Sequence, residues 1–388
     1  MAMSKSPSVD RSQPHPSAPS DPGELSARLA RASAAAAAAG LDAVIVTPGH
    51  DLTYLCGYRA LPLERLTALL IRPGSDPLMI VPELERPAAE ASPVGGLGLV
   101  IQTWQETEDP CQLVAANVPA ASRIAVDDRM WARTAFALRD AVPQAEWVTA
   151  GDVIADLRLR KTAAEVSALQ AAGAAIDAVH AQVAELLRPG RTEREVGGDI
   201  ADLILASGHS QVDFVIVAGG ENGASPHHEV SDRVLQVGDP VVVDIGGTMP
   251  SGYCSDSTRT YSIGEPLPEF LTAYAALQSA QAAAVAYARP GVTCESVDAA
   301  ARDVLTEAGL GEAFVHRTGH GIGLETHEEP YIVSGNTRVL EPGMAFSIEP
   351  GFYLQGRFGA RIEDIVVCAE DGVVNCNNRP RGLVITEV

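Results

Sequence analysis

The chain has 388 residues, enough for two domains that each bury a hydrophobic core. Hydrophobic residues make up 46% of it, which excludes disorder over most of its length. The formal net charge of −22 repels nucleic acid and anionic membranes, so we expect neither as a partner. The six cysteines form no CxxC pair, which argues against a zinc knuckle or a disulfide framework and favours the reducing cytoplasm.

The first part of the chain predicts an arm and a small α/β domain. Residues 1–22 are rich in Ser and Pro and predict a disordered arm, with no apolar segment of signal-peptide length. An Ala-rich helix that ends at Gly40 and the β-branched run at residues 44–46 follow it. Short strands are predicted at residues 66–74 and 77–83. This alternation predicts an α/β domain with a mixed sheet over residues 23–155.

The second domain, predicted over residues 156–388, contains an internal repeat. After a helix-rich stretch at 152–190, the segments 188–208 and 289–309 align at an offset of 101 residues, with seven identities in 21 positions. Each segment predicts a turn, a Thr N-cap and an amphipathic helix that ends at a glycine. Chance similarity between Ala-rich helices is the alternative, and the segments that follow each copy argue against it.

Two carboxylates follow each copy at nearly the same offset. Asp244 ends the apolar run "VVVD" and Asp256 follows it, whereas Glu349 and Glu363 lie in "MAFSIEPGFYLQGRFGARIEDIVV". Two acidic hairpins related by a pseudo-twofold axis would bring four carboxylates together at the centre of one curved sheet. Divalent cations usually keep such a cluster ionised. Alternatively, the aspartates are turn or edge residues, and Asp256 pairs with Arg259.

Histidines lie beside both acidic segments. His316, His320 and His327 occur in "HRTGHGIGLETHEEP", where glycines and a proline argue against a helix and no H-E-x-x-H pattern exists. One imidazole with four carboxylates makes an oxygen-rich site for two ions of Mn²⁺, Co²⁺ or Zn²⁺. His227 and His228 lie in a glycine-rich loop before Asp244, and one of them must point into the cleft to contribute.

With these motifs assembled, the chain from about residue 25 to its C-terminus resembles the pita-bread metallopeptidases, in the prolidase (Xaa-Pro dipeptidase) and Xaa-Pro aminopeptidase branch. The resemblance implies a creatinase-like N-terminal α/β domain and a C-terminal pita-bread domain with a curved, mainly antiparallel sheet. It also implies two divalent metal ions, Mn²⁺ first, held by five residues. Matched motif by motif, these are Asp244, Asp256, His320, Glu349 and Glu363.

The resemblance also implies roles for further residues. His227 and His327, and in addition His316, match histidines that contact the substrate, and Arg361 in "GARIEDIV" matches an arginine that orients a ligand carboxylate. A water that bridges the two metals would attack the scissile carbonyl, and Glu349 would carry its proton to the leaving nitrogen. Both aspartates must face the same side of their hairpin, although their spacing is one residue longer than is usual in the family.

The predicted activity is hydrolysis of the Xaa-Pro bond in dipeptides or short peptides by a cytoplasmic homodimer. An Xaa-Pro aminopeptidase acting on longer peptides is the alternative within the branch. A creatinase-like amidinohydrolase would lack the acidic ligand set, and a methionine aminopeptidase would lack residues 25–150. A catalytically silent binding protein with this fold is the alternative from another class.

Overall fold

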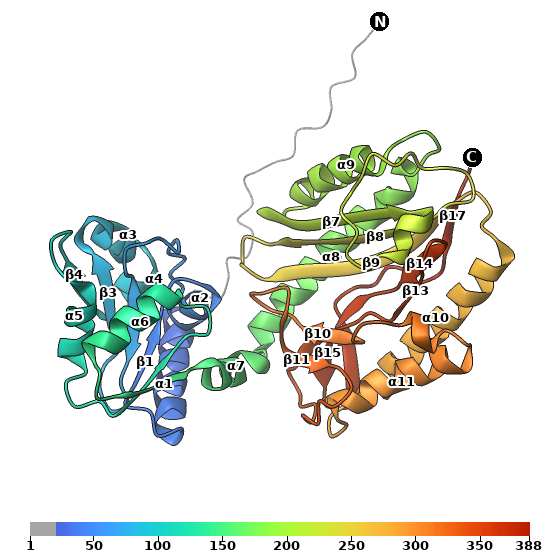
Figure 1. Ribbon diagram of the computed structural model, residues 1–388. Helices are drawn as coiled ribbons and strands as arrows, with labels where there is room; N and C mark the ends of the chain where they lie inside the picture. The colour runs from blue at the N-terminus through green and yellow to red at the C-terminus, as the bar shows by residue number, and fades with distance from the viewer. Residues whose placement is uncertain (1–20) are drawn as a thin grey trace, which may run out of the picture.

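The computed structural model describes residues 21–388 as two α/β units, connected through α7 (Gly151–Leu159) and α8 (Ala163–Leu186). Figure 1 shows the N-terminal unit in blue to green and the C-terminal unit in green to red. The arm predicted over residues 1–22 lies outside the described residues except at its end. There Asp21 caps α1 (Pro22–Ala38) and Pro22 begins it.

A mixed six-stranded sheet forms the centre of the N-terminal unit, in the order β4-β3-β2-β1-β5-β6. Strands β1 and β2 pair antiparallel, as do β2 and β3, and the other neighbours pair parallel. The strands are β1 (Ala43–Val46), β2 (Ala68–Ile71), β3 (Leu78–Pro82), β4 (Val100–Trp104), β5 (Arg123–Val126) and β6 (Glu146–Thr149). Beside α1, its helices are α2 (His50–Cys56), η1 (Glu83–Glu85), α3 (Arg86–Ala91), α4 (Pro93–Gly96), α5 (Pro110–Asn117) and α6 (Ala132–Ala141).

The two helices α7 and α8 connect the units. The predicted boundary near residue 155 falls inside α7. The chain leaves the helical path at Arg160, which forms an isolated β-bridge with Met344 of the C-terminal unit. Thr162 and Glu165 then start α8 with a capping box. The break lets the linker pair with the C-terminal unit before it becomes helical again.

Three hydrogen-bonded ladders make up the sheet of the C-terminal unit, and nearly all their pairs are antiparallel. The first contains β17 (Val384–Thr386), β9 (Cys254–Ile263), β8 (Pro240–Thr248) and β7 (Gln211–Gly219) in that order. The second contains β11 (Glu328–Ile332), β10 (Gly319–Gly321), β12 (Ala345–Ile348), β15 (Asp364–Ala369) and β16 (Gly372–Asn375). The third is the hairpin of β13 (Gly351–Leu354) and β14 (Phe358–Arg361). The mixed α/β fold class with a mainly antiparallel second sheet is confirmed.

Each copy of the predicted repeat contains a helix. α9 (Glu193–Ala206) and α11 (Cys294–Glu307) each begin after a threonine, and α10 (Pro268–Tyr287) packs against α11. Short 3₁₀ turns are η2 (Gly220–Ala224) and η3 (Gly311–Ala313). Thr192 caps its helix as predicted and forms a capping box with Glu195, whereas Thr293 occupies the predicted N-cap position without a side-chain hydrogen bond. The two copies therefore share their helix but only the first has the full cap.

The acidic segment after the second copy departs from a simple strand pair. Glu349 lies between β12 and β13, and Glu363 lies between β14 and β15, so both glutamates occupy interruptions of the strands. Pro350 has no N–H to donate to a ladder, which accounts for the interruption after β12. A backbone hydrogen bond of 3.1 Å from Glu363 to Thr258 O nevertheless joins this segment to β9. The two acidic segments therefore meet directly.

The cysteines are structural. All six are free and buried, and burial raises the pKa of every thiol, that of Cys254 to about 12. Cys254 is thus a packed side chain and not a nucleophile. Among residues 21–388, none of the helices combines the length and the apolar character needed to cross a bilayer.

Candidate metal centre

The hairpin of β8 and β9 places both predicted aspartates on one face. Asp244 lies opposite Thr258, and Asp256 lies opposite Gly246. Residues two apart along a strand share a face, so Asp244 and Asp256 project to the same side. The longer connection between the aspartates therefore leaves the register intact. Arg259, the alternative partner of Asp256, pairs instead with Asp364 at 2.6 Å.

His320 reaches the carboxylates from β10. Its Nδ1 lies 3.1 Å from Gly321 O, where it must donate, which leaves Nε2 free to accept or to bind a cation. That Nε2 lies 3.2 Å from Glu349 Oε1, 3.7 Å from Asp256 Oδ2 and 4.0 Å from Glu363 Oε1. A Cβ added at Gly319 would lie 1.9 Å from Ser347 O, so glycine permits β10 to approach β12 closely.

These five residues, named here the metal cluster, converge at one point. Two sets of possible ligand atoms, each within 4.8 Å of one another, draw on the metal cluster alone: His320 with Glu349 and Glu363, and Asp244 with Asp256 and Glu363. Asp244 Oδ1 is buried without a hydrogen-bond partner among the described residues. A buried oxygen without a donor is costly and suits a cation ligand. The donor set therefore fits divalent metal ions.

The electrostatics of the metal cluster also call for cations. Burial and the neighbouring carboxylates raise the pKa values of Asp256 and Glu363 well above the ordinary range. Burial alone would also raise the pKa of Glu349, but its hydrogen bond and charge interaction with His320 lower it to about 2. One carboxylate is thus ionised while two others compete for protons, which bound cations would displace.

Arg361 connects the metal cluster to a series of hydrogen bonds through Tyr353 and His316. Its guanidinium donates to Asp244 Oδ2 and, at 2.6 Å, to the Tyr353 hydroxyl. That hydroxyl lies 2.8 Å from His316 Nε2, and His316 Nδ1 lies 2.7 Å from Arg317 O. Both ring nitrogens of His316 are therefore engaged within the protein. Sequence reasoning missed Tyr353, which no motif set apart from the other aromatic residues.

The loop before β8 separates the roles of His227 and His228. His227 lines the cavity above the metal cluster, whereas His228 Nε2 lies 2.8 Å from Glu193 Oε2. The buried Glu193 carboxylate also accepts from Gly219 N, from the Asn222 amide and from the backbone and hydroxyl of Ser231. Glu193 therefore anchors the loop that carries His227. Sequence reasoning missed it, because an acidic residue in a first helical turn usually serves the helix alone.

A cavity of about 750 Å³ opens over the metal cluster. Besides the five predicted ligands it is lined by Asp213, Phe214, Ile216, Pro226, His227, His316, Arg317, Thr326, His327 and Arg361. It adjoins a second cavity of about 530 Å³ that both units line and that shares Asp213, Thr326 and His327 with it. All the site residues predicted from sequence thus face one cavity.

His327 stands between the two cavities. Its ring centroid lies 4.0 Å from that of His320, edge to face. Its nitrogen also falls within 4.8 Å of possible ligand atoms of Asp256 and His320, which makes it a further candidate ligand. Burial, together with the charges of His320 and Arg317, lowers the pKa of His327 to about 4. The imidazole is therefore neutral at pH 7 and can donate one hydrogen bond.

Comparison with known proteins identifies both units of the chain. Residues 167–370 match metallopeptidase family M24, and residues 28–160 match the creatinase/prolidase N-terminal domain. The probable dipeptidase PepE of Mycobacterium tuberculosis is 56% identical over 93% of this chain and 96% of its own length. The Xaa-Pro dipeptidase of Lactobacillus helveticus is 38% identical over 89% of this chain and 95% of its own.

Solved structures show the same architecture. Dipeptidase PepE from Mycobacterium ulcerans superposes with a TM-score of 0.92 at 55% identity, covering 95% of this chain and 99% of that one. Xaa-Pro dipeptidase from Bacillus anthracis gives 0.85 at 32% identity, covering 93% and 99%. The resemblance first noticed in the acidic motifs is confirmed, and the chain belongs to metallopeptidase family M24, with a creatinase/prolidase N-terminal domain preceding its peptidase domain.

Proposed function

We propose that this peptidase hydrolyses the Xaa-Pro bond of dipeptides and uses two divalent metal ions. The carrying observation is the convergence of four carboxylates and His320 below a cavity of about 750 Å³. The names of its dipeptidase and Xaa-Pro dipeptidase relatives support the substrate class.

The metal cluster would hold the ions, since each of its two ligand sets brings three donors together. The predominance of carboxylate oxygens favours Mn²⁺, with Co²⁺ and Zn²⁺ as alternatives. Bound ions of this kind lower the pKa of water and stabilise negative charge on oxygen. Asp244 is held in place by the Arg361 guanidinium, which leaves its Oδ1 free for an ion.

The protein's own groups would move the proton and stabilise the developing charge. Glu349, kept ionised by His320, accepts the proton of the attacking water and passes it to the leaving imide nitrogen. His227 and the neutral His327 face the cavity and donate hydrogen bonds to the substrate carbonyl oxygen. Phe214, Ile216 and Pro226 provide the apolar wall against which a substrate side chain or a proline ring packs.

Arg317 favours a dipeptide over a longer peptide. It lines the cavity, and its guanidinium lies 4.4 Å from the centre of the Tyr331 ring. Within residues 21–388 no carboxylate forms a salt bridge with Arg317. A free carboxylate directly after proline would supply that partner, whereas a longer peptide carries a neutral amide there.

A matched pair of peptides tests the proposal. Chelator-stripped protein is loaded with Mn²⁺, and hydrolysis of Ala-Pro is compared with that of Ala-Pro-Ala, with metal content measured in parallel. We expect metal-dependent cleavage that is faster for Ala-Pro. Faster cleavage of Ala-Pro-Ala would indicate the aminopeptidase alternative. Two bound metals with no cleavage of either peptide would contradict the proposal and favour the silent binding protein.

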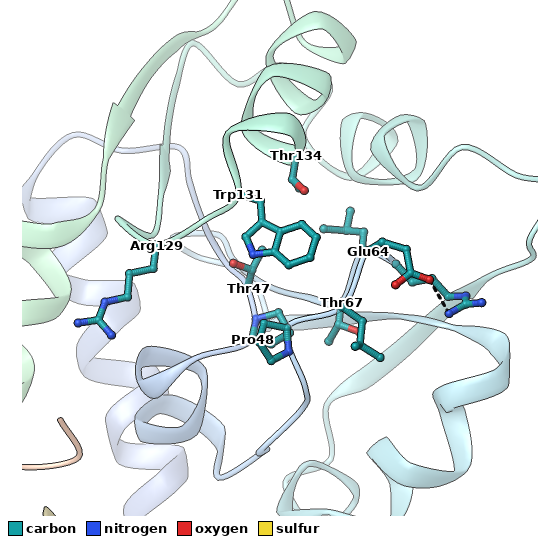
Figure 2. A pocket seen from close by; sticks show the side chains of 11 residues that line it. Thr47, Pro48, Glu64, Thr67, Arg129, Trp131 and Thr134 are labelled. Carbon is teal, nitrogen blue, oxygen red and sulfur yellow. Dashed lines mark hydrogen bonds and ion pairs between the residues drawn. The ribbon is translucent and has the colours of Figure 1, made fainter. Parts of the chain in front are cut away.

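We also propose that the protein is a cytoplasmic homodimer whose N-terminal units take part in the contact. Leu61, Leu63, Trp131 and Phe136 are large apolar side chains exposed on that unit. Figure 2 shows Trp131 beside Thr47 and Pro48 over a small surface cavity. Sedimentation analysis should give a dimer, and Phe136→Glu should shift it toward the monomer.

A further inference from the structure

Six charged side chains join the two units beside the metal cavity. Asp51 and Arg129 belong to the N-terminal unit, and Arg158 and Lys161 to the end of α7 and the break before α8. The remaining two, Glu325 and Glu328, flank the segment that carries His327. We call these six residues the junction network. Three cations and three anions balance one another within it.

Arg158 is the centre of the junction network. Its Nη1 donates to Asp51 Oδ1 at 2.7 Å and to Glu325 Oε1 at 2.7 Å, and its Nη2 donates to Glu328. Lys161 donates to Glu328 and, at 2.8 Å, to Arg158 O. Arg129 forms a salt bridge with Glu325 from the N-terminal side. Glu325 is therefore reached by one cation from each side of the junction.

Most of the junction network is shielded from water. The side chains of Arg158 and Glu328 are each 9% exposed and that of Lys161 is 2% exposed, whereas Arg129 is 67% exposed. Ion pairs in such surroundings are weakly screened and hold their geometry, because moving one partner strands a buried charge. The outer members Asp51 and Arg129 are the ones that can be replaced without opening a core.

The segment held in this way presents His327 to the reaction. Glu325 and Glu328 flank Thr326 and His327, and both of these residues line the metal cavity. Further back, Gly323 O accepts from Cys254 N at 2.8 Å, which anchors the segment to β9. By contrast, no hydrogen bond within residues 21–388 engages the His327 ring. The backbone of the segment, together with the His320 ring, therefore determines where the imidazole points.

We propose that the junction network is a positioning device for His327, through which Asp51 and Arg129 of the N-terminal unit contribute to turnover without touching the substrate. Figure 2 shows the Arg129 guanidinium turned away from Trp131. Arg129 also lines that surface cavity, and its guanidinium pairs with Glu325 across the junction. The kinetic consequence rests on the proposed function, whereas the structural consequence does not.

Hydrogen exchange in the metal-free full-length protein tests the structural part. Asp51→Ala and Arg129→Ala should each raise amide exchange of residues 322–328 about tenfold, because the segment loses its outer anchors. The matched control is Arg86→Ala, which removes an arginine of the N-terminal unit that forms salt bridges with Glu83 and Glu90 and donates to the Thr103 hydroxyl. It should leave the exchange of this segment unchanged. Unchanged exchange in both junction variants would overturn the proposal.

A double-mutant cycle tests the link to His327. In the Mn²⁺-loaded enzyme, each junction variant should lower kcat on Ala-Pro about 5- to 20-fold, with KM changed less than about twofold. In a His327→Ala background the same changes should alter kcat less than about twofold, since the group they position is gone. Equal losses in both backgrounds would contradict a role through His327. If the wild-type enzyme cleaves neither peptide, the proposed function fails, and the exchange experiment still decides the positioning role.

Discussion

The metal cluster and the junction network are two groups of largely buried charged side chains, and they differ in charge balance. The metal cluster brings four carboxylates together with His320 and a single guanidinium, that of Arg361. The junction network matches three carboxylates with three cations of the chain. The second is complete with side chains alone, whereas the first requires cations from solution. A surplus of buried charge thus distinguishes a binding site from a structural contact.

The largest effect is expected from removing one carboxylate of the metal cluster. Asp256→Asn removes a carboxylate from the ligand set that Asp256 forms with Asp244 and Glu363, so metal content should fall and Ala-Pro hydrolysis should drop by about a thousandfold or more. The metal-free variant should be at least as stable as the wild type, because repulsion is relieved. Asp199→Asn, which changes an exposed carboxylate on α9, is the control. Retained metal and activity would remove Asp256 from the metal cluster.

Removing one charge from the junction network should instead lower the stability of the metal-free protein. Lys161→Met leaves Glu328 with one cation in a buried position, and unfolding free energy should fall by about 3–5 kcal/mol. Urea unfolding of the metal-free protein measures it. Metal stoichiometry should stay the same. A Lys161→Met protein as stable as the wild type would mean that the junction network is not a unit of paired charge.

His327 lies where the two charge groups meet. His327→Ala should reduce kcat by about 10²- to 10³-fold through loss of a hydrogen-bond donor to the developing oxyanion, with both metals retained. Kinetics and metal analysis on one preparation separate the outcomes. Parallel loss of metal and activity would make His327 a ligand, which its place in one ligand set also allows.

The smallest expected effect is the pH dependence of stability without metal. Asp256 and Glu363 have raised pKa values. Their contribution to the free energy of unfolding is therefore fully present below about pH 4 and is lost as the pH rises. Burial would raise the pKa of Glu328, but Lys161 and Arg158 lower it below 4.5, so its contribution is lost as the pH falls through that range. The melting temperature is measured as a function of pH for the wild type and both variants. Asp256→Asn should flatten this dependence at the high-pH end, and Glu328→Gln should flatten it at the low-pH end. If both variants changed the melting temperature at the same end of the pH range, the proposed difference in charge balance between the two groups would be wrong.

The metal cluster could be predicted from sequence because each member lies in a local motif and the motifs recur in order. The capping box of Thr192 and the strands around Asp244 follow from local rules of the same kind. The interruptions at Glu349 and Glu363 were not predicted, because alternation of side chains does not reveal where a ladder breaks.

The junction network lay beyond sequence reasoning. Its salt bridges join residues 107 to 196 positions apart, from Asp51–Arg158 to Arg129–Glu325, and a single arginine or glutamate carries no local pattern that names its partner. Glu193 and Tyr353 escaped for the same reason, since each matters through tertiary contacts alone. Local chemistry predicted the reactive groups, and only the fold identified what supports them.

The six buried thiols have a practical consequence. Because burial keeps them protonated and out of reach, alkylating reagents should ignore the folded protein and report only its opening. Cys56 and Cys111 lie in the N-terminal unit, and the other four lie in the C-terminal unit. A time course of labelling, read peptide by peptide, would therefore reveal which half of the molecule opens first on heating.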